Sequence, residues 1–224
     1  AHSPTLLRFK PFLAFRSVNE LTHQNNIANT SYSELQNGIS MKMYEGYPQL
    51  CMQFSKTNTY VHQPDWNKNI EYYKEQERGY AFKEDLLVPG YFEMPIKKGE
   101  SIIFSGGVTE VSPRTLKSLW DKELTRRIQR SDMFSTLKNS AEQFYKRVGD
   151  KTYLMAGYPW FGARARDEFV SLVSSTILID RMDYFDAIID TAIPEIERFM
   201  EGDREGFVLE GIDDPDVFLY FILA

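Results

Sequence analysis

Cysteine and histidine are scarce in this 224-residue chain, which has one cysteine, Cys51, and three histidines. A single cysteine excludes a disulfide framework and any zinc site built on cysteines. The 26 basic residues are outnumbered by 32 acidic ones, and the net charge of −6 disfavours nucleic-acid binding. No apolar run approaches the roughly 18 residues of a membrane helix, and no signal-peptide core follows the N-terminus. These absences predict a cytoplasmic chain with no nucleic-acid or membrane partner.

What is present is an ordinary globular composition, with 42% hydrophobic and 26% charged residues and a surplus of aromatics at 14%. The chain opens at Ala1 without Met and stops inside the apolar run 217–224. Because helices usually finish with a Gly, a polar turn or a Pro, we expect this sequence to be an internal piece of a longer protein.

Apolar and polar residues alternate with a period of two in the first half of the chain. The clearest runs are residues 7–15, 39–43 and 50–54. Such alternation indicates half-buried antiparallel strands. Asn37-Gly38 precedes the second run and is a strong hairpin signal. Short strands with turn signals at this spacing predict a β-sandwich over residues 1–111.

The period changes at Ser112-Pro113, a helix cap followed by proline at the first helical position. Apolar residues then fall at helical spacing in four stretches, 116–128, 134–148, 169–178 and 185–200. A non-helical stretch with Gly157, Pro159 and Gly162 separates the second from the third. We predict linker helices over 112–149 and the opening of an all-α unit over 150–224.

An acidic cluster between 203 and 216 is the strongest metal candidate in the sequence. It lacks the alternating oxygen ligands and the glycine of an EF-hand, so a solvated loop between helices is favoured. His23 and His62 have no partner at ligand spacing. We therefore predict no metal site and no cofactor.

An aromatic loop precedes the third helical stretch, with Tyr158, Trp160 and Phe161 among Gly and Pro residues. Flat aromatic faces in such a loop suit a ligand with polar edges, such as a sugar. Arg166-Asp167 follows at the helix start. On the residues alone, an N-cap is the favoured role for Asp167, and catalysis stays open beside it.

The block Ala156-Gly157-Tyr158-Pro159-Trp160-Phe161-Gly162, followed by Arg166-Asp167 and Phe169, resembles a known signature. It is similar to A-G-[YF]-P-W-F-G-R-W-G-R-D-T-F, which opens the catalytic domain of bacterial and archaeal glycogen debranching enzymes of the amylo-α-1,6-glucosidase type. The stretches 12–25 and 77–92, with Glu77-Arg78-Gly79-Tyr80 and Pro89-Gly90-Tyr91-Phe92, look like the N-terminal domain of that family. The stretch 216–221 resembles its D-x-x-L-W-F helix.

This resemblance implies an α+β chain: part of an antiparallel β-sandwich, a helical linker, and the first helices of an (α/α) six-hairpin barrel. It also implies a glycoside hydrolase of glycogen catabolism that cleaves α-1,6-linked glucose at branch points. Such hydrolysis needs a proton donor and a base on opposite sides of the sugar.

The resemblance carries site roles to five residues. Asp167 would be the general acid, and Arg166 would position it or bind a hydroxyl. Trp160 and Phe161 would line the sugar subsite, and Asp216 would bind sugar hydroxyls. The base is expected beyond Ala224, so these residues alone are expected to be inactive.

Four departures from the family signature leave a second interpretation open. The chain has Ala163-Arg164-Ala165 where the family has R-W-G, so one tryptophan is absent, and Glu168 in place of Thr puts an acidic residue beside Asp167. These changes also fit a paralogue that binds α-glucan without cleaving it, or a structural, interacting protein. The exposed apolar helix faces of an unfinished barrel predict a homodimer.

Overall fold

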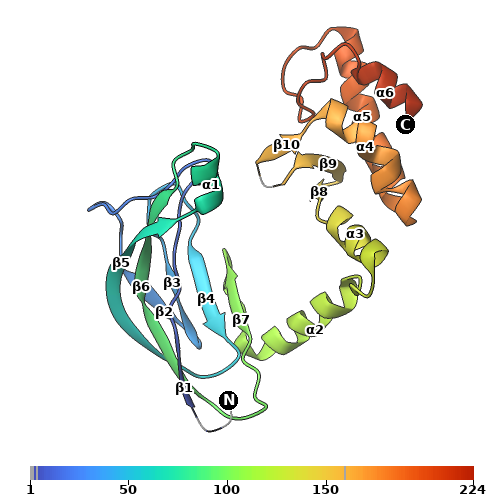
Figure 1. Ribbon diagram of the computed structural model, residues 1–224. Coiled ribbons are helices and arrows are strands. Elements are labelled where there is room, and N and C mark those ends of the chain that lie inside the picture. The colour runs from blue at the N-terminus through green and yellow to red at the C-terminus, as the bar shows by residue number, and fades with distance from the viewer. Residues whose placement is uncertain (1–2, 4, 159) are drawn as a thin grey trace. The chain divides into compact units, whose positions relative to one another are not determined.

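A computed structural model describes residues 3, 5–158 and 160–224. The chain divides into two compact units, residues 1–126 and 127–224, each with its own secondary structure (Figure 1). The first unit is dominated by strands and the second by helices.

Two antiparallel sheets make up most of the first unit. One has the strand order β1-β6-β5, from β1 (Thr5–Phe9), β5 (Thr59–Glu71) and β6 (Lys83–Ile96). The other has the order β2-β3-β4-β7, from β2 (Tyr32–Leu35), β3 (Gly38–Met41), β4 (Leu50–Phe54) and β7 (Phe104–Gly107). A short helix α1 (Tyr73–Glu77) joins β5 to β6.

The apolar residues of both sheets meet in one core, as in a sandwich. Its fully buried members include Met41 on β3, Phe54 on β4 and Phe92 on β6. Phe54 and Phe92 lie with ring centroids 4.9 Å apart, so the two sheets touch through their aromatic residues. The apolar side chains that alternate in the sequence of β3 and β4 are therefore in the core, but Ser40 and Gln53 between them are buried as well, so these strands are not half-buried as predicted.

The hairpin signal at Asn37-Gly38 is confirmed, although the turn sits one residue earlier. Leu35 pairs with Gly38, so Gln36 and Asn37 form the turn, and Asn37 adopts the left-handed conformation with φ of 54°. Asparagine tolerates that conformation better than most residues.

Helix α2 (Leu116–Arg126) ends the first unit. A 3-10 turn (Pro113–Thr115) leads into it, with Ser112 as the N-cap residue and Pro113 at the first helical position. The helix start predicted at Ser112-Pro113 is confirmed.

The second unit places a small sheet among helices. Its helices are α3 (Met133–Ala141), α4 (Ala165–Ser175), α5 (Met182–Glu201) and α6 (Val217–Leu223). Its strands β8 (Tyr145–Val148), β9 (Lys151–Gly157) and β10 (Phe161–Ala163) form an antiparallel sheet with β9 in the middle.

The predicted helical stretch 134–148 is wrong in its second half. Helix α3 ends at Ala141, and Tyr145–Val148 is strand β8, which pairs with β9 through a two-residue turn. Gly149, with φ of 65°, occupies that turn and favours the hairpin over a longer helix. The predicted helices around 169–178 and 185–200 are confirmed as α4, followed by a 3-10 turn, and α5.

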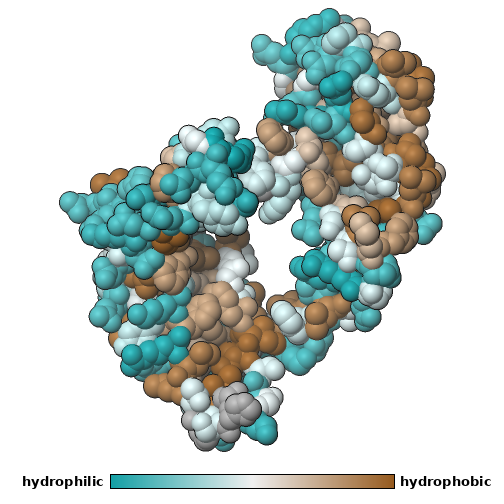
Figure 2. All heavy atoms as spheres, viewed as in Figure 1, coloured by the Kyte–Doolittle hydropathy of each residue, from teal (hydrophilic) through white to brown (hydrophobic). Residues whose placement is uncertain are grey.

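Two clusters of buried residues form the core of the second unit. One joins Phe169 of α4 to Ala192 of α5 and Val217 of α6, and the other joins Leu154 of β9 to Leu172 and Ile188. Apolar side chains also remain outside, and Figure 2 shows hydrophobic residues gathered on the visible face of the helices of this unit. Leu178, Ile222 and Leu223 are 66%, 79% and 70% exposed.

The expected α+β class is confirmed, with antiparallel sheets first and helices afterwards. The boundaries at 111 and 149 and the opening of an (α/α) barrel stay predictions. No helix in the described parts of the chain is long and apolar enough to span a membrane.

Candidate functional site

The five predicted site residues all lie in the second unit. Trp160 stands between β9 and β10, and Phe161 is the first residue of β10. Arg166 and Asp167 belong to the first turn of α4, and Asp216 directly precedes α6. Pro159 of the same loop lies outside the described residues.

The aromatic side chains of the loop face outward. Trp160 is 60% exposed and Phe161 is 48% exposed. Phe161 lies so close over Gly157 that a Cβ there would come within 2.6 Å of its Cδ2. The guanidinium carbon of Arg164 sits 4.6 Å from the Phe161 ring centroid. Gly157 and Arg164 thus hold the Phe161 ring, while Trp160 stays open to a ligand.

Asp167 is exposed in the first turn of α4 and is not the N-cap of that helix. The N-cap residue is Arg164, in extended conformation and without a capping side-chain bond, so the N-cap interpretation of Asp167 is wrong. The Asp167 carboxylate has no hydrogen-bond or ion-pair partner among the described residues, whereas its carbonyl oxygen accepts from Ser171 Oγ at 2.6 Å. Its carboxylate is therefore available to a group from outside.

Arg166 and Asp216, fifty positions apart in sequence, are brought together. Arg166 Nε donates to Asp216 Oδ2 at 2.8 Å, and Arg166 also lies 5.9 Å from the Tyr220 ring centroid. This hydrogen bond, with the negative charge of Asp216, raises the pKa of Arg166 above its ordinary value. The pair connects the start of α4, where Asp167 lies, to the start of α6.

Backbone hydrogen bonds also join the start of α4 to the segment that precedes α6. The Glu210 amide donates to the Ala163 carbonyl at 2.9 Å, and the Ala165 amide donates to the Glu210 carbonyl at 3.0 Å. Arg164 and Glu210 also form an ion pair with 3.6 Å between Nε and Oε2. The acidic stretch before α6 is thus an ordered partner of β10 and α4.

Glu168 does not present a negative charge next to Asp167, contrary to what its position in the sequence indicates. Its side chain turns inward and is 1% exposed, and its Oε2 accepts from the Leu154 amide of β9 at 2.8 Å. Burial raises the pKa of Glu168 to about 8, with a further contribution from the charge of Glu195. Glu168 therefore carries a proton at neutral pH.

Glu195 of α5 is a second buried acid, which sequence reasoning missed. Its Oε1 accepts from the Tyr153 hydroxyl at 3.1 Å, and its Oε2 accepts from the amides of Val208 and Leu209, each at 3.1 Å. The signal available was a glutamate inside the apolar stripe of a helix, beside Ile196. These hydrogen bonds connect α5 to β9 and to the segment that follows α5, so Glu195 has a structural role.

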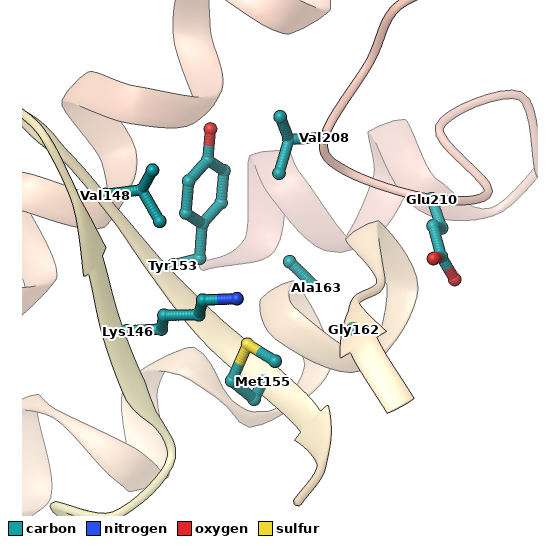
Figure 3. A pocket seen from close by; sticks show the side chains of 8 residues that line it. All are labelled: Lys146, Val148, Tyr153, Met155, Gly162, Ala163, Val208 and Glu210. Carbon is teal, nitrogen blue, oxygen red and sulfur yellow. The ribbon is translucent and has the colours of Figure 1, made fainter. Parts of the chain in front are cut away.

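A small hollow of about 180 Å³ lies beside the loop (Figure 3). Its walls are Val148, Tyr153, Met155, Gly162, Ala163 and Val208, with Lys146 and Glu210 at its sides. Lys146 extends its amine into the hollow, whereas the carboxylate of Glu210 points away from it (Figure 3). None of the five predicted site residues lines this hollow.

Metal ligands do not gather around these residues. Within the described ranges, no three or more His, Cys, Asp or Glu side chains are grouped so that they could hold a metal ion. The candidate site is therefore an exposed carboxylate, an Arg–Asp pair and an aromatic loop.

The fold and site define a two-unit α+β protein whose antiparallel sheets precede a helical unit with an open aromatic loop. Residues 1–103 match the family described as "Glycogen debranching enzyme N terminal". This match is consistent with a fragment of a glycogen debranching enzyme and agrees with the resemblance that the sequence shows. The match stops before the second unit and does not include the five site residues. No curated protein matches the chain, and no solved structure matches it.

Proposed function

We propose that this protein takes part in glycogen debranching as a glycoside hydrolase that acts on α-1,6-linked glucose at branch points. The observation that carries the proposal is the exposed carboxylate of Asp167, which has no partner among the described residues and lies beside the Arg166–Asp216 pair. The family match of the preceding unit supplies the substrate class. A cytoplasmic location and an α-glucan ligand are parts of the same proposal.

In this proposal Asp167 is the general acid that protonates the leaving oxygen. Trp160 provides a stacking face for a sugar ring. Arg166 has five N–H donors, and its bond to Asp216 uses Nε, so the others can reach sugar hydroxyls. Asp216 then both orients Arg166 and offers its second oxygen to a hydroxyl.

A cationic sugar mimic tests the role of Asp167. The transition state of glycoside hydrolysis resembles an oxocarbenium ion, so a protonated iminosugar should interact with the carboxylate more strongly than a neutral sugar does. We expect Asp167→Asn to weaken iminosugar binding about tenfold and to leave maltohexaose binding nearly unchanged. If the iminosugar binds both proteins equally, the Asp167 carboxylate does not lie beside the bound sugar and the proposal fails.

Electrophoresis in a gel containing glycogen tests the aromatic loop. We expect the chain to be retarded, and Trp160→Ala to reduce the retardation because it removes the stacking face. Tyr73→Ala is the matched control, since Tyr73 is a similarly exposed aromatic residue, 63% exposed, in the first unit. Equal mobility of the original chain in gels with and without glycogen would count against the loop as a sugar site.

A second candidate is binding of α-glucan without cleavage, as in a non-catalytic paralogue. Arg164 favours it, because it stands where the family signature has tryptophan and lies over Phe161. Incubation with a branched limit dextrin, followed by an assay for released glucose, distinguishes the two candidate functions. We expect no glucose release from these 224 residues, since no carboxylate in them is assigned as the base. Release that Asp167→Asn abolishes would contradict that expectation and exclude the non-catalytic candidate.

A further inference from the structure

A polar hollow of about 310 Å³, called the edge hollow below, lies in the first unit, and no residue of the proposed site lines it. It opens between β2, an outer strand of the four-stranded sheet, and β5, an outer strand of the three-stranded sheet. Its polar and aromatic lining residues are Tyr32, Glu34, Asn37, Asn58, Thr59 and Tyr60.

The walls of this edge hollow are held in place by hydrogen bonds. Asn58 Nδ2 donates to the Asn37 carbonyl at 2.9 Å, which ties the segment before β5 to the β2–β3 turn. The Tyr60 hydroxyl donates to the Pro89 carbonyl at 2.8 Å and thereby fixes the Tyr60 ring. Burial raises the pKa of Tyr60 to about 12, so this ring stays neutral at physiological pH. The hollow is therefore preformed.

Several polar groups of the edge hollow have nothing to bind within the described chain. They are the Glu34 carboxylate, the Tyr32 and Thr59 hydroxyls and the Asn58 side-chain oxygen. Glu34 and Thr59 are exposed, while Tyr32 and Asn58 are partly buried. Together they offer one charged acceptor, one amide acceptor and two hydroxyls that donate or accept.

Aromatic rings form an apolar side of the same hollow. The Tyr32 and Tyr60 rings pack edge to face with centroids 4.8 Å apart, and the His62 ring lies 4.9 Å from Tyr32. A ring beside carboxylate, amide and hydroxyl groups matches the C–H face and the hydroxyl edges of a pyranose. No lysine or arginine is among the residues that line it, and Glu34 would repel an anion.

We propose that the edge hollow is a second carbohydrate site, which binds a neutral α-linked gluco-oligosaccharide independently of the aromatic loop. Its preference for a saccharide follows from its own lining, whereas the α-glucan identity rests on the proposed function. Such a site would keep the first unit attached to a branched polymer while another chain end occupies the loop.

The experiment uses the full chain, labelled with ¹⁵N, in a Trp160→Ala background that removes the loop's stacking face. Titration with maltohexaose should shift the amide resonances of Asn37, Gly38, Asn58 and Thr59 in a saturable way. Glu34→Ala should weaken this binding about tenfold, because it removes a charge-assisted hydrogen bond. Ser33→Ala, one position away on β2, should leave it unchanged.

The outcomes separate this proposal from the preceding one. Absence of shifts around the hollow, or equal weakening by Glu34→Ala and Ser33→Ala, overturns the second site whatever the loop does. Equal shifts with cellohexaose overturn only its α-glucan identity, because that sugar has β linkages. Glu34 is exposed and has no partner among the described residues, so its replacement by Ala should leave the fold intact.

Discussion

Glu84 and Glu168 are both buried acids, 0% and 1% exposed, but their partners place them in opposite charge states. Glu84 accepts from Arg16 Nε at 2.5 Å, from the Tyr72 hydroxyl at 2.5 Å and from the Thr22 amide at 3.1 Å. Burial alone would raise the pKa of Glu84, but these bonds outweigh it and hold that pKa below its ordinary value. Glu168 has one such hydrogen bond, and its second oxygen, Oε1, is buried with no hydrogen-bond partner in the described part of the chain.

Glu168 should make the second unit less stable as the pH rises. The folded-state pKa of about 8 lies above the ordinary 4.5, so the folded chain binds more protons between these values. Stability then falls across that window, in total by a few kcal/mol, and levels off above it. Glu168→Gln keeps an acceptor for the Leu154 amide and removes the ionisation. We expect the urea unfolding midpoint of this variant to rise relative to that of the original chain between pH 5 and pH 8. A constant difference between the two midpoints over this range would contradict a protonated, buried Glu168.

The ion pair between Glu84 and Arg16 should contribute more to the free energy of unfolding than an exposed ion pair does. Glu84→Ala leaves Arg16 partly buried without its anion, and removal of one partner of a buried pair typically costs about 3–5 kcal/mol. Because the pKa of Glu84 is lowered, this stabilisation is present above pH 4.5 and fades as the pH falls below it. Urea unfolding at pH 7 measures the loss.

Glu93→Ala on the same strand is the matched control for Glu84. Its partner Arg8 has a side chain that is 60% exposed, so solvent screens the pair and the loss should be much smaller. Equal losses for the two variants would show that the Glu84 contacts add nothing beyond an exposed ion pair.

At the scale of elements, helix α5 ends at a glycine that adopts the left-handed backbone conformation. Gly202 is its C-cap with φ of 111°, and its amide donates back to the carbonyls of Arg198 and Phe199. An alanine is strained in that conformation, so Gly202→Ala should lower the free energy of unfolding by about 1 kcal/mol. Glu201→Ala, the preceding residue, should change it little. Thermal unfolding of both variants checks the pair, and equal midpoints would contradict the cap.

Helices α4 and α5 could be predicted from the sequence because the apolar residues of each lie on one helical face. Strand β4 could be predicted because apolar and polar residues alternate along it. Strand β5 was missed since it lies at a sheet edge, is mostly solvated, contains Pro64 and shifts register twice. Strand β8 was missed because its apolar residues continue the helical spacing of α3. The turn Gly149-Asp150 was the signal that could have separated them.

The candidate site was less accessible to sequence reasoning than the fold. Asp167 and Asp216 came from a resemblance, and only the structure shows that Arg166 joins α4 to Asp216. The inward turn of Glu168 depends on the Leu154 amide, which lies on another element and cannot be seen from spacing. The edge hollow likewise forms where two strands that are distant in sequence meet.

At the scale of the whole molecule, the two units have separate cores, and both leave apolar helix surface in contact with solvent. In the first unit Leu119, Trp120 and Leu124 of α2 are 45–54% exposed. In the second, α6 contributes Ile222 and Leu223, and the 3-10 turn after α4 contributes Leu178. Monomeric proteins rarely leave wide apolar patches uncovered, and a self-complementary contact is the commonest way to cover them.

We therefore propose a homodimer that buries these helix faces, and light scattering after size exclusion tests it. The original chain should elute with twice its 26.1 kDa mass at micromolar concentration. Ile222→Lys combined with Leu178→Lys should shift it to the monomer, because two buried lysines in each partner would have no counter-charge. Glu201→Lys, also exposed and on a helix of the same unit, should leave the dimer intact and so separates lost apolar contact from added charge. A monomeric original chain would contradict the dimer and leave the exposed faces to another partner.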